Sequence, residues 1–428
     1  MKPQVHKLAN GLTIASDPVP TLETVALGVW VDVGARHEKA EENGITHLIE
    51  HMVFKGTKTR SARAIAEEIE SRGGFLNAYT SRDQTCFHAR VLKDDAALAA
   101  DIIADLVRNP LFAEDELARE KDVVLQEIGQ AADTPDDIIF DHLQAQAFAD
   151  QPLGRPVLGT PRTVKALSRK DIAAYQRHAY VPKRMIFAAS GAISHDRAAR
   201  LAGKLLGDAP SGKASKPARA RFTGGEYRSE QKLEQAHVAF CIEGVAANDP
   251  GAMTAQIFSL LFGGGMSSRL FQELREKRGL CYEIHSFSGS HAETGLFGVY
   301  AGTSAQGIGE LVPLVIGELE RAARDVTEEE VARAKAQMKA GLLMALESCS
   351  SRAEQLARHV LAYGRPLAVE ELVARIDAVS VESTRKAAQA LLSRSRPAVV
   401  ALGGGRGLDT AVAFAEGLTK SKAKTLLH

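Results

Sequence analysis

The order of predicted elements repeats along the chain, and this repeat constrains the fold more than any other feature. In the first half, an alternating apolar segment at 23–35 is followed by helical periodicity at 44–70 and then by the strand-like FLNAYTSRDQTCFHARV. In the second half, QAHVAFCIEG, a helical stretch with GGGMSSRLFQELREKRG, and YEIHSFSGSHAETGLFGVYAGTS follow in the same order. Each half therefore predicts a largely antiparallel sheet with helices packed on it, an α+β protein of two similar domains.

A segment with few large apolar residues separates the two halves. Residues 208–229 are rich in Pro, Gly, Ser, Lys and Arg, which is the composition of a linker. We therefore predict an N-terminal domain at 1–212, a linker at 213–221 and a C-terminal domain at 222–428. Two domains also suit the length, because 428 residues exceed one ordinary hydrophobic core.

The charge balance excludes a general attraction to nucleic acid or to a membrane surface. Lys and Arg number 53, and so do Asp and Glu. No apolar run approaches the ~18 residues of a membrane span, so we expect no membrane insertion. The N-terminal residues lack signal-peptide features, and a bacterial cytoplasm is the expected location, with the mitochondrial matrix as the alternative. The cysteines form no Cys-x-x-Cys pair and are expected to be reduced thiols: Cys86, Cys241, Cys281 and Cys349.

The sharpest chemical signal is the motif His47-Leu-Ile-Glu50-His51. On a helix the two histidines lie only about 40° apart, side by side for one Zn²⁺, with the carboxylate beside them. Neutral imidazole is a favoured zinc ligand, and a nearby glutamate can take a proton from a metal-activated water. Asn43 is the expected N-cap and Gly56 the expected helix end. Ile45, Leu48, Ile49 and Met52 form the apolar face of this helix, and the three motif residues project from the opposite face. The alternative is an ordinary amphipathic helix whose polar side holds two histidines by chance.

A third protein ligand is needed, and the helical segment LAREKDVVLQEIGQ offers two carboxylates. Glu120 and Glu127 are seven residues apart and share one helix face beside an apolar stripe. Both would lie at the margin of the packed surface, where a carboxylate can face a site. The alternative is a charged flank of a surface helix, which is the commoner role of a glutamate.

Several long stretches resemble the pitrilysin-type (M16) zinc metallopeptidases. Within them the chain is similar to the β subunit of the mitochondrial processing peptidase and its bacterial homologues. The matching stretches are GITHLIEHMVFKGT, LNAYTSRDQT, EKDVVLQE, FDHLQAQAFADQPLGRPVLG and GGGMSSRLFQELREKRGLCY. The resemblance implies one zinc ion per chain, with His47, His51 and Glu127 as ligands. It also implies Glu50 as the general base and Glu120 as a supporting acidic residue near the site.

The resemblance also implies residues that bind the substrate backbone. Asn77 and Ala78 match the strand on which the family lays its substrate as an added β-strand. Arg275 and Tyr282 match an Arg…Tyr pair that meets the substrate across from the zinc. The alternatives are that Asn77 is an ordinary strand residue next to a turn, that Arg275 pairs with a nearby glutamate, and that Tyr282 belongs to the core.

A preference for arginine two residues before the cut is the last implication. Asp137 and Asp141 match an acidic pair that recognises this arginine, and two aspartates at i, i+4 share a helix face. One of the two positions carries a shorter carboxylate than the glutamate that the resemblance leads us to expect. The alternative is a helix start, with Thr134 as N-cap, Pro135 at N1 and Asp137 at the capping-box position.

Together these features predict a metalloendopeptidase that cleaves short or unfolded peptides, with presequence-like peptides as candidates. We expect a homodimer, because one chain carries both the zinc motif and the Arg275–Tyr282 pair. The turn at 263–265 resembles a family loop near the substrate, or is a flexible connection before a helix. Two other classes remain as alternatives, a non-catalytic assembly subunit and a peptide-binding module that needs a different partner chain. Within the enzyme class, a broad oligopeptidase competes with an arginine-directed processing peptidase.

Overall fold

The computed structural model describes residues 2–212, 217–393 and 396–403, which form two compact units. Unit 1 is built from three separate stretches of sequence: 2–129, 155–218 without its undescribed residues, and 342–369. Unit 2 contains the remaining described residues. None of the helices in the described part of the chain is both long enough and apolar enough to cross a membrane.

Unit 1 is organised around a six-stranded mixed sheet with the order β1-β2-β6-β3-β5-β4. Only the β2–β6 pair is parallel. The strand β4 lies at one edge and is paired on one side only, with β5. The strands are β1 (Gln4–Lys7), β2 (Thr13–Pro18), β3 (Thr24–Val31), β4 (Phe75–Thr80), β5 (Thr85–Leu92) and β6 (Met185–Gly191).

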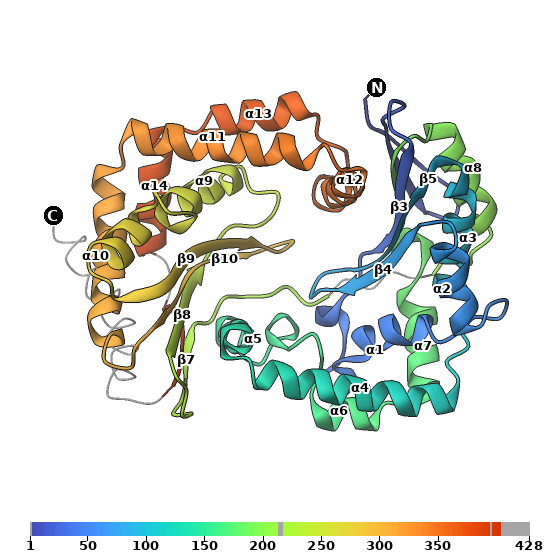
Figure 1. Ribbon diagram of the computed structural model, residues 1–428, viewed down its shortest axis with the longest axis horizontal. Coiled ribbons are helices and arrows are strands. Elements are labelled where there is room, and N and C mark those ends of the chain that lie inside the picture. Colours follow the sequence, from blue (N-terminus) through green and yellow to red (C-terminus); the bar gives the residue numbers. More distant parts are fainter. Residues whose placement is uncertain (1, 213–216, 394–395, 404–428) are drawn as a thin grey trace. The chain divides into compact units, whose positions relative to one another are not determined.

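Helices cover both faces of this sheet (Figure 1). One face packs in a large apolar core against α1 (Ile45–Val53), α2 (Ala62–Glu70), α3 (Ala96–Arg108), α4 (Glu114–Ala132), α6 (Pro161–Ala166), α7 (Arg169–Ala179) and α8 (His195–Leu206). The other face is covered by α12 (Cys349–Tyr363), which comes from the second half of the sequence. Short 3-10 turns lie at Ala35–His37, Ala40–Glu42, Lys93–Asp95, Pro152–Gly154 and Pro182–Arg184.

Unit 2 has a five-stranded sheet with the order β7-β11-β8-β10-β9, in which only β7–β11 is parallel. The strands are β7 (Gly225–Ser229), β8 (Ala236–Glu243), β9 (Cys281–Ser290), β10 (Gly295–Thr303) and β11 (Ala398–Leu402). On one face lies α5 (Pro135–Ala147), from the first half of the sequence. The remaining helices are α9 (Ala252–Gly263), a π-helical turn at Phe271–Glu276, α10 (Ile308–Asp325), α11 (Glu328–Ala345), α13 (Val369–Asp377) and α14 (Val381–Ser393).

The two sheets share one topology, which confirms the prediction of two similar α+β folds. The order β2-β6-β3-β5-β4 corresponds strand by strand to β7-β11-β8-β10-β9. The helices α5 and α12 hold equivalent places in the two halves, and each packs in the unit built mainly from the other half. The domain boundaries at 1–212 and 222–428 stay a prediction. The linker at 213–221 includes residues 213–216, which lie outside the described residues.

Local signals in the sequence were less reliable than the overall pattern. The predicted helical run at 44–70 is two helices, α1 and α2, separated by an irregular segment with a left-handed Gly56 (φ +121°). At the start of α5, Thr134 is the N-cap and Pro135 occupies the first turn, as predicted. The capping-box interpretation of Asp137 is wrong, because the Thr134 hydroxyl donates back to the Gln130 carbonyl instead.

Candidate metal centre

The helix α1 is anchored by an apolar face and by an acidic residue outside the helix. Its buried side includes Ile45, Leu48, Ile49 and Met52, as the periodicity predicts. The N-cap is Gly44 in the left-handed region (φ +95°), so the prediction of Asn43 as N-cap is wrong. The buried Glu38 carboxylate caps the helix from outside, accepting bonds from the Gly44 and Thr46 backbone N–H groups at 2.8 and 2.9 Å. Asn43 donates its amide to the same carboxylate at 2.9 Å.

The helix α4 brings both predicted glutamates to the histidines of α1. Glu127 Oε2 lies 3.8 Å from His47 Nε2 and 3.6 Å from His51 Nε2. One ligand atom from each of these three residues lies within 4.8 Å of the other two. Among the described residues, they form a group that could hold a metal ion. Spacings of this size are those of ligands that surround one tetrahedral ion at about 2.0–2.2 Å each.

Glu120 orients the second histidine. Its Oε2 lies 2.9 Å from His51 Nδ1, and its Oε1 forms an ion pair with Lys55 at 2.7 Å. Burial raises the pKa of this carboxyl, but hydrogen bonds from Lys55 and His51 outweigh burial and lower the pKa overall. An ionised Glu120 accepts the Nδ1 proton of His51, which leaves the Nε2 lone pair facing Glu127. Carboxylate support of this kind is usual for histidine ligands of zinc.

The remaining polar atoms fit a metal that the protein would hold here. Burial and the neighbouring His51 lower the pKa of His47 to about 4, so its imidazole is neutral and carries a free lone pair. Glu127 Oε2 is buried and has no hydrogen-bond partner among the described residues. Orphaned buried acceptors are costly unless an ion or a water satisfies them, so the donor set suits Zn²⁺.

Glu50 lies beside this cluster on the same helix. Burial raises the pKa of its carboxyl and Glu127 raises it further, against a lowering by His51, with a net upward shift. Within the described residues, Glu50 Oε2 and Thr80 Oγ1 are both buried without a hydrogen-bond partner. A carboxyl with a raised pKa and an unused oxygen is suited to accept a proton near neutral pH.

The edge strand β4 borders the cluster and packs against α1. The strand carries Asn77 and Ala78, and Asn77 Oδ1 accepts a bond from the exposed Ala78 N–H at 2.8 Å. The strand β4 therefore packs beside the helix that carries Glu50 and the histidines, and among the described residues one of its edges is unpaired.

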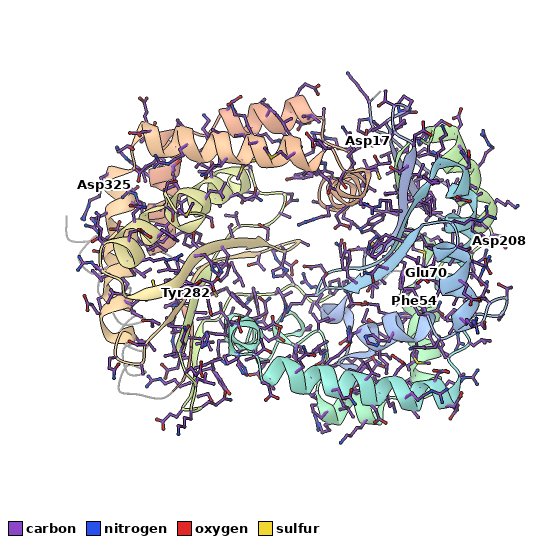
Figure 2. All side chains as sticks on the ribbon, in the orientation of Figure 1. Asp17, Phe54, Glu70, Asp208, Tyr282 and Asp325 are labelled. Carbon is purple, nitrogen blue, oxygen red and sulfur yellow. The ribbon has the colours of Figure 1, made fainter. Side chains whose placement is uncertain are left out.

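Arg275 and Tyr282 lie together in unit 2. The Arg275 guanidinium lies over the Tyr282 ring at 5.1 Å and over the Phe271 ring at 4.6 Å. The alternative that Tyr282 is a core residue is wrong, because the residue is 75% exposed (labelled in Figure 2). The alternative that Arg275 pairs with a nearby glutamate is also wrong, because among the described residues its guanidinium stacks on these two rings and forms no such ion pair. The structure thus brings this pair together, in a different unit from the histidines of α1.

Asp137 and Asp141 lie one turn apart on α5, also in unit 2. Asp137 is exposed, and Asp141 is partly buried beside His142. Burial lowers the pKa of His142 and outweighs the opposing effect of Asp141. The turn at 263–265 ends α9, with Gly264 as its C-cap.

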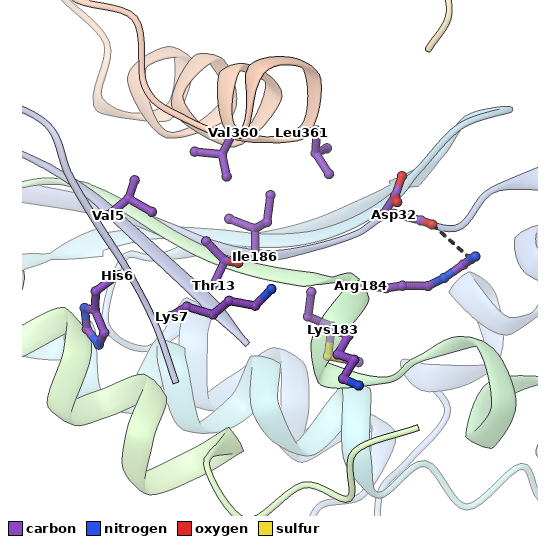
Figure 3. Close-up of a pocket in the computed structure, with 12 residues that line it drawn as sticks. Val5, His6, Lys7, Thr13, Asp32, Lys183, Arg184, Ile186, Val360 and Leu361 are labelled. Atoms are coloured by element: carbon purple, nitrogen blue, oxygen red, sulfur yellow. Dashed lines mark hydrogen bonds between the residues drawn. The ribbon is translucent and has the colours of Figure 1, made fainter. Parts of the chain in front are cut away.

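A separate cavity of about 400 Å³ lies elsewhere in unit 1, among β1, β6 and α12 (Figure 3). Its apolar wall includes Ile186 and Val360, and its polar wall includes Lys7, Lys183 and Arg184. Arg184 donates to the Asp32 carbonyl at 3.2 Å. None of the metal-cluster residues lines it, so this cavity is not part of the candidate site.

Comparisons with known proteins agree with this geometry. The family described as "Insulinase (Peptidase family M16)" matches residues 13–161, and "Peptidase M16 inactive domain" matches residues 166–338. A zinc protease of Rickettsia felis is 35% identical over 390 residues, covering 91% of this chain and 95% of the relative. The mitochondrial-processing peptidase subunit beta of Mus musculus is 37% identical over 413 residues, covering 94% and 84%. The crystal structure of a protease from Helicobacter pylori has the same fold, with a TM-score of 0.87 at 22% identity, covering 94% and 99%.

The fold and the cluster of two histidines and a glutamate define a metallopeptidase, a hydrolase of the metalloendopeptidase class. The chain belongs to peptidase family M16.

Two residues of the site carried no recognisable signal in the sequence. Glu38 stands nine positions before His47, and its capping role depends on a loop that folds back onto the start of α1. Lys55 follows the motif closely but meets Glu120 only because α4 packs beside α1.

Proposed function

We propose that the chain is a zinc-dependent endopeptidase in which His47, His51 and Glu127 hold one zinc ion and Glu50 is the general base. The observation that carries this proposal is the convergence of the three ligand atoms within 4.8 Å of one another. The support of His51 by Glu120 at 2.9 Å gives the cluster the protonation state that a metal site requires.

The chemistry proposed is hydrolysis of a peptide bond. When bound, a zinc ion polarises the scissile carbonyl and lowers the pKa of a water molecule to about 7. Glu50 takes the proton of the attacking water and later delivers it to the leaving amine. The raised pKa of Glu50 suits both steps, because the group must accept and then release one proton.

The substrates we propose are short or unfolded peptides. An extended peptide would add to the free edge of β4, where Asn77 and Ala78 offer backbone and amide groups. Main-chain pairing tolerates many sequences but requires an extended chain, so folded proteins are poor substrates.

We further propose a homodimer in which Arg275 and Tyr282 of one chain face the zinc site of its partner. An exposed phenol and a guanidinium held by two rings are suited to donate to peptide carbonyls and to a developing oxyanion. The presence of both parts of the site in one chain type supports a dimer of identical chains. Its relatives described as zinc proteases are bacterial, which supports the bacterial cytoplasm as the location.

The finer specificity proposed is for arginine two residues before the cut, bound by Asp137 and Asp141. The aspartates lie one helical turn apart, a spacing that a guanidinium can bridge. The mouse relative is a processing peptidase by its name, which supports this choice over a broad oligopeptidase.

The test is mass-spectrometric mapping of cuts in a basic, presequence-like peptide by the zinc-loaded wild type and by Glu50→Gln. Glu70→Gln is the matched control, since Glu70 is an exposed carboxylate of α2 away from the cluster. We expect cuts by the wild type and the control and none by Glu50→Gln. A wild type that cuts nothing with zinc present, or a fully active Glu50→Gln, would refute the proposal.

A further inference from the structure

A carboxylate of α12 joins two strands of the unit 1 sheet on the face opposite to the metal cluster. Glu354 Oε2 accepts a hydrogen bond from Trp30 Nε1 of β3 at 2.9 Å. Glu354 Oε1 accepts one from the Tyr79 hydroxyl of β4 at 2.7 Å. Trp30 and Tyr79 both pair with Cys86 of β5, so these three residues form one row across three strands beneath α12.

The hydroxyl of Tyr79 is held from two directions. It donates to Glu354 and accepts a bond from Gln84 Nε2 at 2.9 Å. Gln84 belongs to the turn between β4 and β5, where its backbone also pairs with Ser81 at 2.8 Å. Burial raises the pKa of Tyr79, so the phenol stays protonated and remains a donor.

The next residue of β4 faces the catalytic side. Successive side chains of a strand point to opposite faces, so Tyr79 faces α12 while Thr80 faces Glu50. Because β4 is an edge strand, no strand of the described part of the chain pairs with its other side. Edge strands with few hydrogen bonds to their neighbours undergo local unfolding most easily. The hydrogen bond between Tyr79 and Glu354 should therefore help to keep β4 ordered.

We propose that Glu354 is a positioning residue that, through Tyr79, holds the free edge of β4 in place to receive a peptide. The inference rests on the proposed function, since it takes β4 as the peptide-binding edge. It goes further by making a helix from the second half of the sequence part of the peptide-binding apparatus.

Trp30 offers an internal control for this role. Tyr79→Phe and Trp30→Phe each remove one donor from the same partly buried carboxylate, and each retains an aromatic ring. Only the Tyr79 bond ties α12 to β4, whereas Trp30 lies on the central strand β3. A general effect on core stability would appear in both variants, and an effect on the edge strand only in Tyr79→Phe.

The first measurement is equilibrium binding of a fluorescent basic peptide to Glu50→Gln protein that also carries each change. We expect Tyr79→Phe to weaken binding about threefold to tenfold, the usual effect of one lost hydrogen bond, and Trp30→Phe to change it less than about twofold. Equal weakening by both changes, or none by Tyr79→Phe, would overturn the positioning role. Failure of the Glu50→Gln parent to bind any peptide would instead overturn the proposed function, and this inference with it.

The second measurement is turnover in the otherwise wild-type protein. We expect Glu354→Gln, which keeps the side-chain volume and one acceptor, to raise KM while kcat and zinc content stay within about twofold. Loss of zinc or an equal fall in kcat at unchanged KM would show that Glu354 acts on the metal site or the fold, and would contradict the proposal.

Discussion

His51 Nδ1 and Glu120 Oε2 lie 2.9 Å apart, although the two residues are 69 positions apart in the sequence. The bond fixes which nitrogen of the imidazole carries the proton, and therefore which nitrogen faces Glu127. The Lys55 ammonium, 2.7 Å from the other oxygen, keeps Glu120 ionised for this purpose. The orientation of His51 in the candidate metal site thus depends on Glu120 and, through Glu120, on the partly exposed Lys55.

Replacing Glu120 by Gln should weaken zinc binding about tenfold to hundredfold, because His51 loses its carboxylate acceptor. Competition with a chelator of known affinity measures this, and Glu116→Gln, on the same helix but paired with Arg119, is the control. Equal zinc affinity in the wild type and Glu120→Gln would show that Glu120 does not orient the histidine.

The stability of the protein should fall as the pH drops from about 6.5 towards 4, partly because of His37. Burial, Arg184 and Arg36 lower the pKa of His37 to about 4, and the ring accepts a bond from the Gly34 N–H. The unfolded chain takes up a proton on His37 near pH 6.5, whereas the folded chain does not. The contribution of His37 to the free energy of unfolding is therefore complete above about pH 6.5 and declines as the pH falls towards 4.

His37→Asn keeps an acceptor for Gly34 but does not titrate. The loss in free energy of unfolding between about pH 7.5 and about pH 5 should therefore be about 1–2 kcal/mol smaller in this variant. Urea unfolding of both proteins at the two pH values measures the difference. Parallel pH profiles would mean that His37 has an ordinary pKa in the folded state.

Changing Asp137 and Asp141 together to Asn should remove the preference for arginine while leaving general peptidase activity. The amides retain the size of the side chains but lose the charge that a guanidinium requires. Cleavage maps of peptides that differ only in Arg or Gln two residues before the cut measure the ratio. Asp133→Asn, an exposed residue before α5, is the control. An unchanged ratio in the double variant would assign the specificity elsewhere.

Two inactive variants should restore activity when their chains are mixed, if sites are shared across a homodimer. Glu50→Gln supplies an intact Arg275, and Arg275→Ala supplies an intact Glu50. Random pairing makes half of the dimers mixed, each with one complete site, so activity should return to about a quarter of the wild type. Recovery is measured after chain exchange, with each variant alone as the reference. No recovery, despite exchange shown by labelled chains, would place both residues in one chain's own site.

The sequence predicted the repeated sheet and the proximity of His47, His51 and Glu127 because both depend on regular spacing. His47 and His51 are one helical turn apart, and Glu127 follows on a helix whose apolar stripe gives its orientation. These relations are local, or are implied by the resemblance to known peptidases. The pairing order of the two sheets then confirmed that the two halves have similar folds.

Other features depend on contacts between distant segments and left no pattern to read. The capping of α1 by Glu38 replaces the predicted Asn43, because a loop carries the carboxylate to the helix end. Glu354 resembles any glutamate on an amphipathic helix until α12 packs over Trp30 and Tyr79. The cation–π stacking of Arg275 likewise required the π-helical turn to lie next to β9.

The exchange of α5 and α12 between the two units has a consequence for biosynthesis. Ala26, Trp30 and Ile186 become shielded from water only when α12 arrives, long after the rest of their sheet has been synthesised. A nascent first half would therefore leave the ribosome with one sheet face bare, dependent on chaperones or on rapid completion of the chain. Although the sequence contains two similar halves, the polypeptide should fold as one cooperative unit. The two halves, expressed separately, should become stable only when they are mixed.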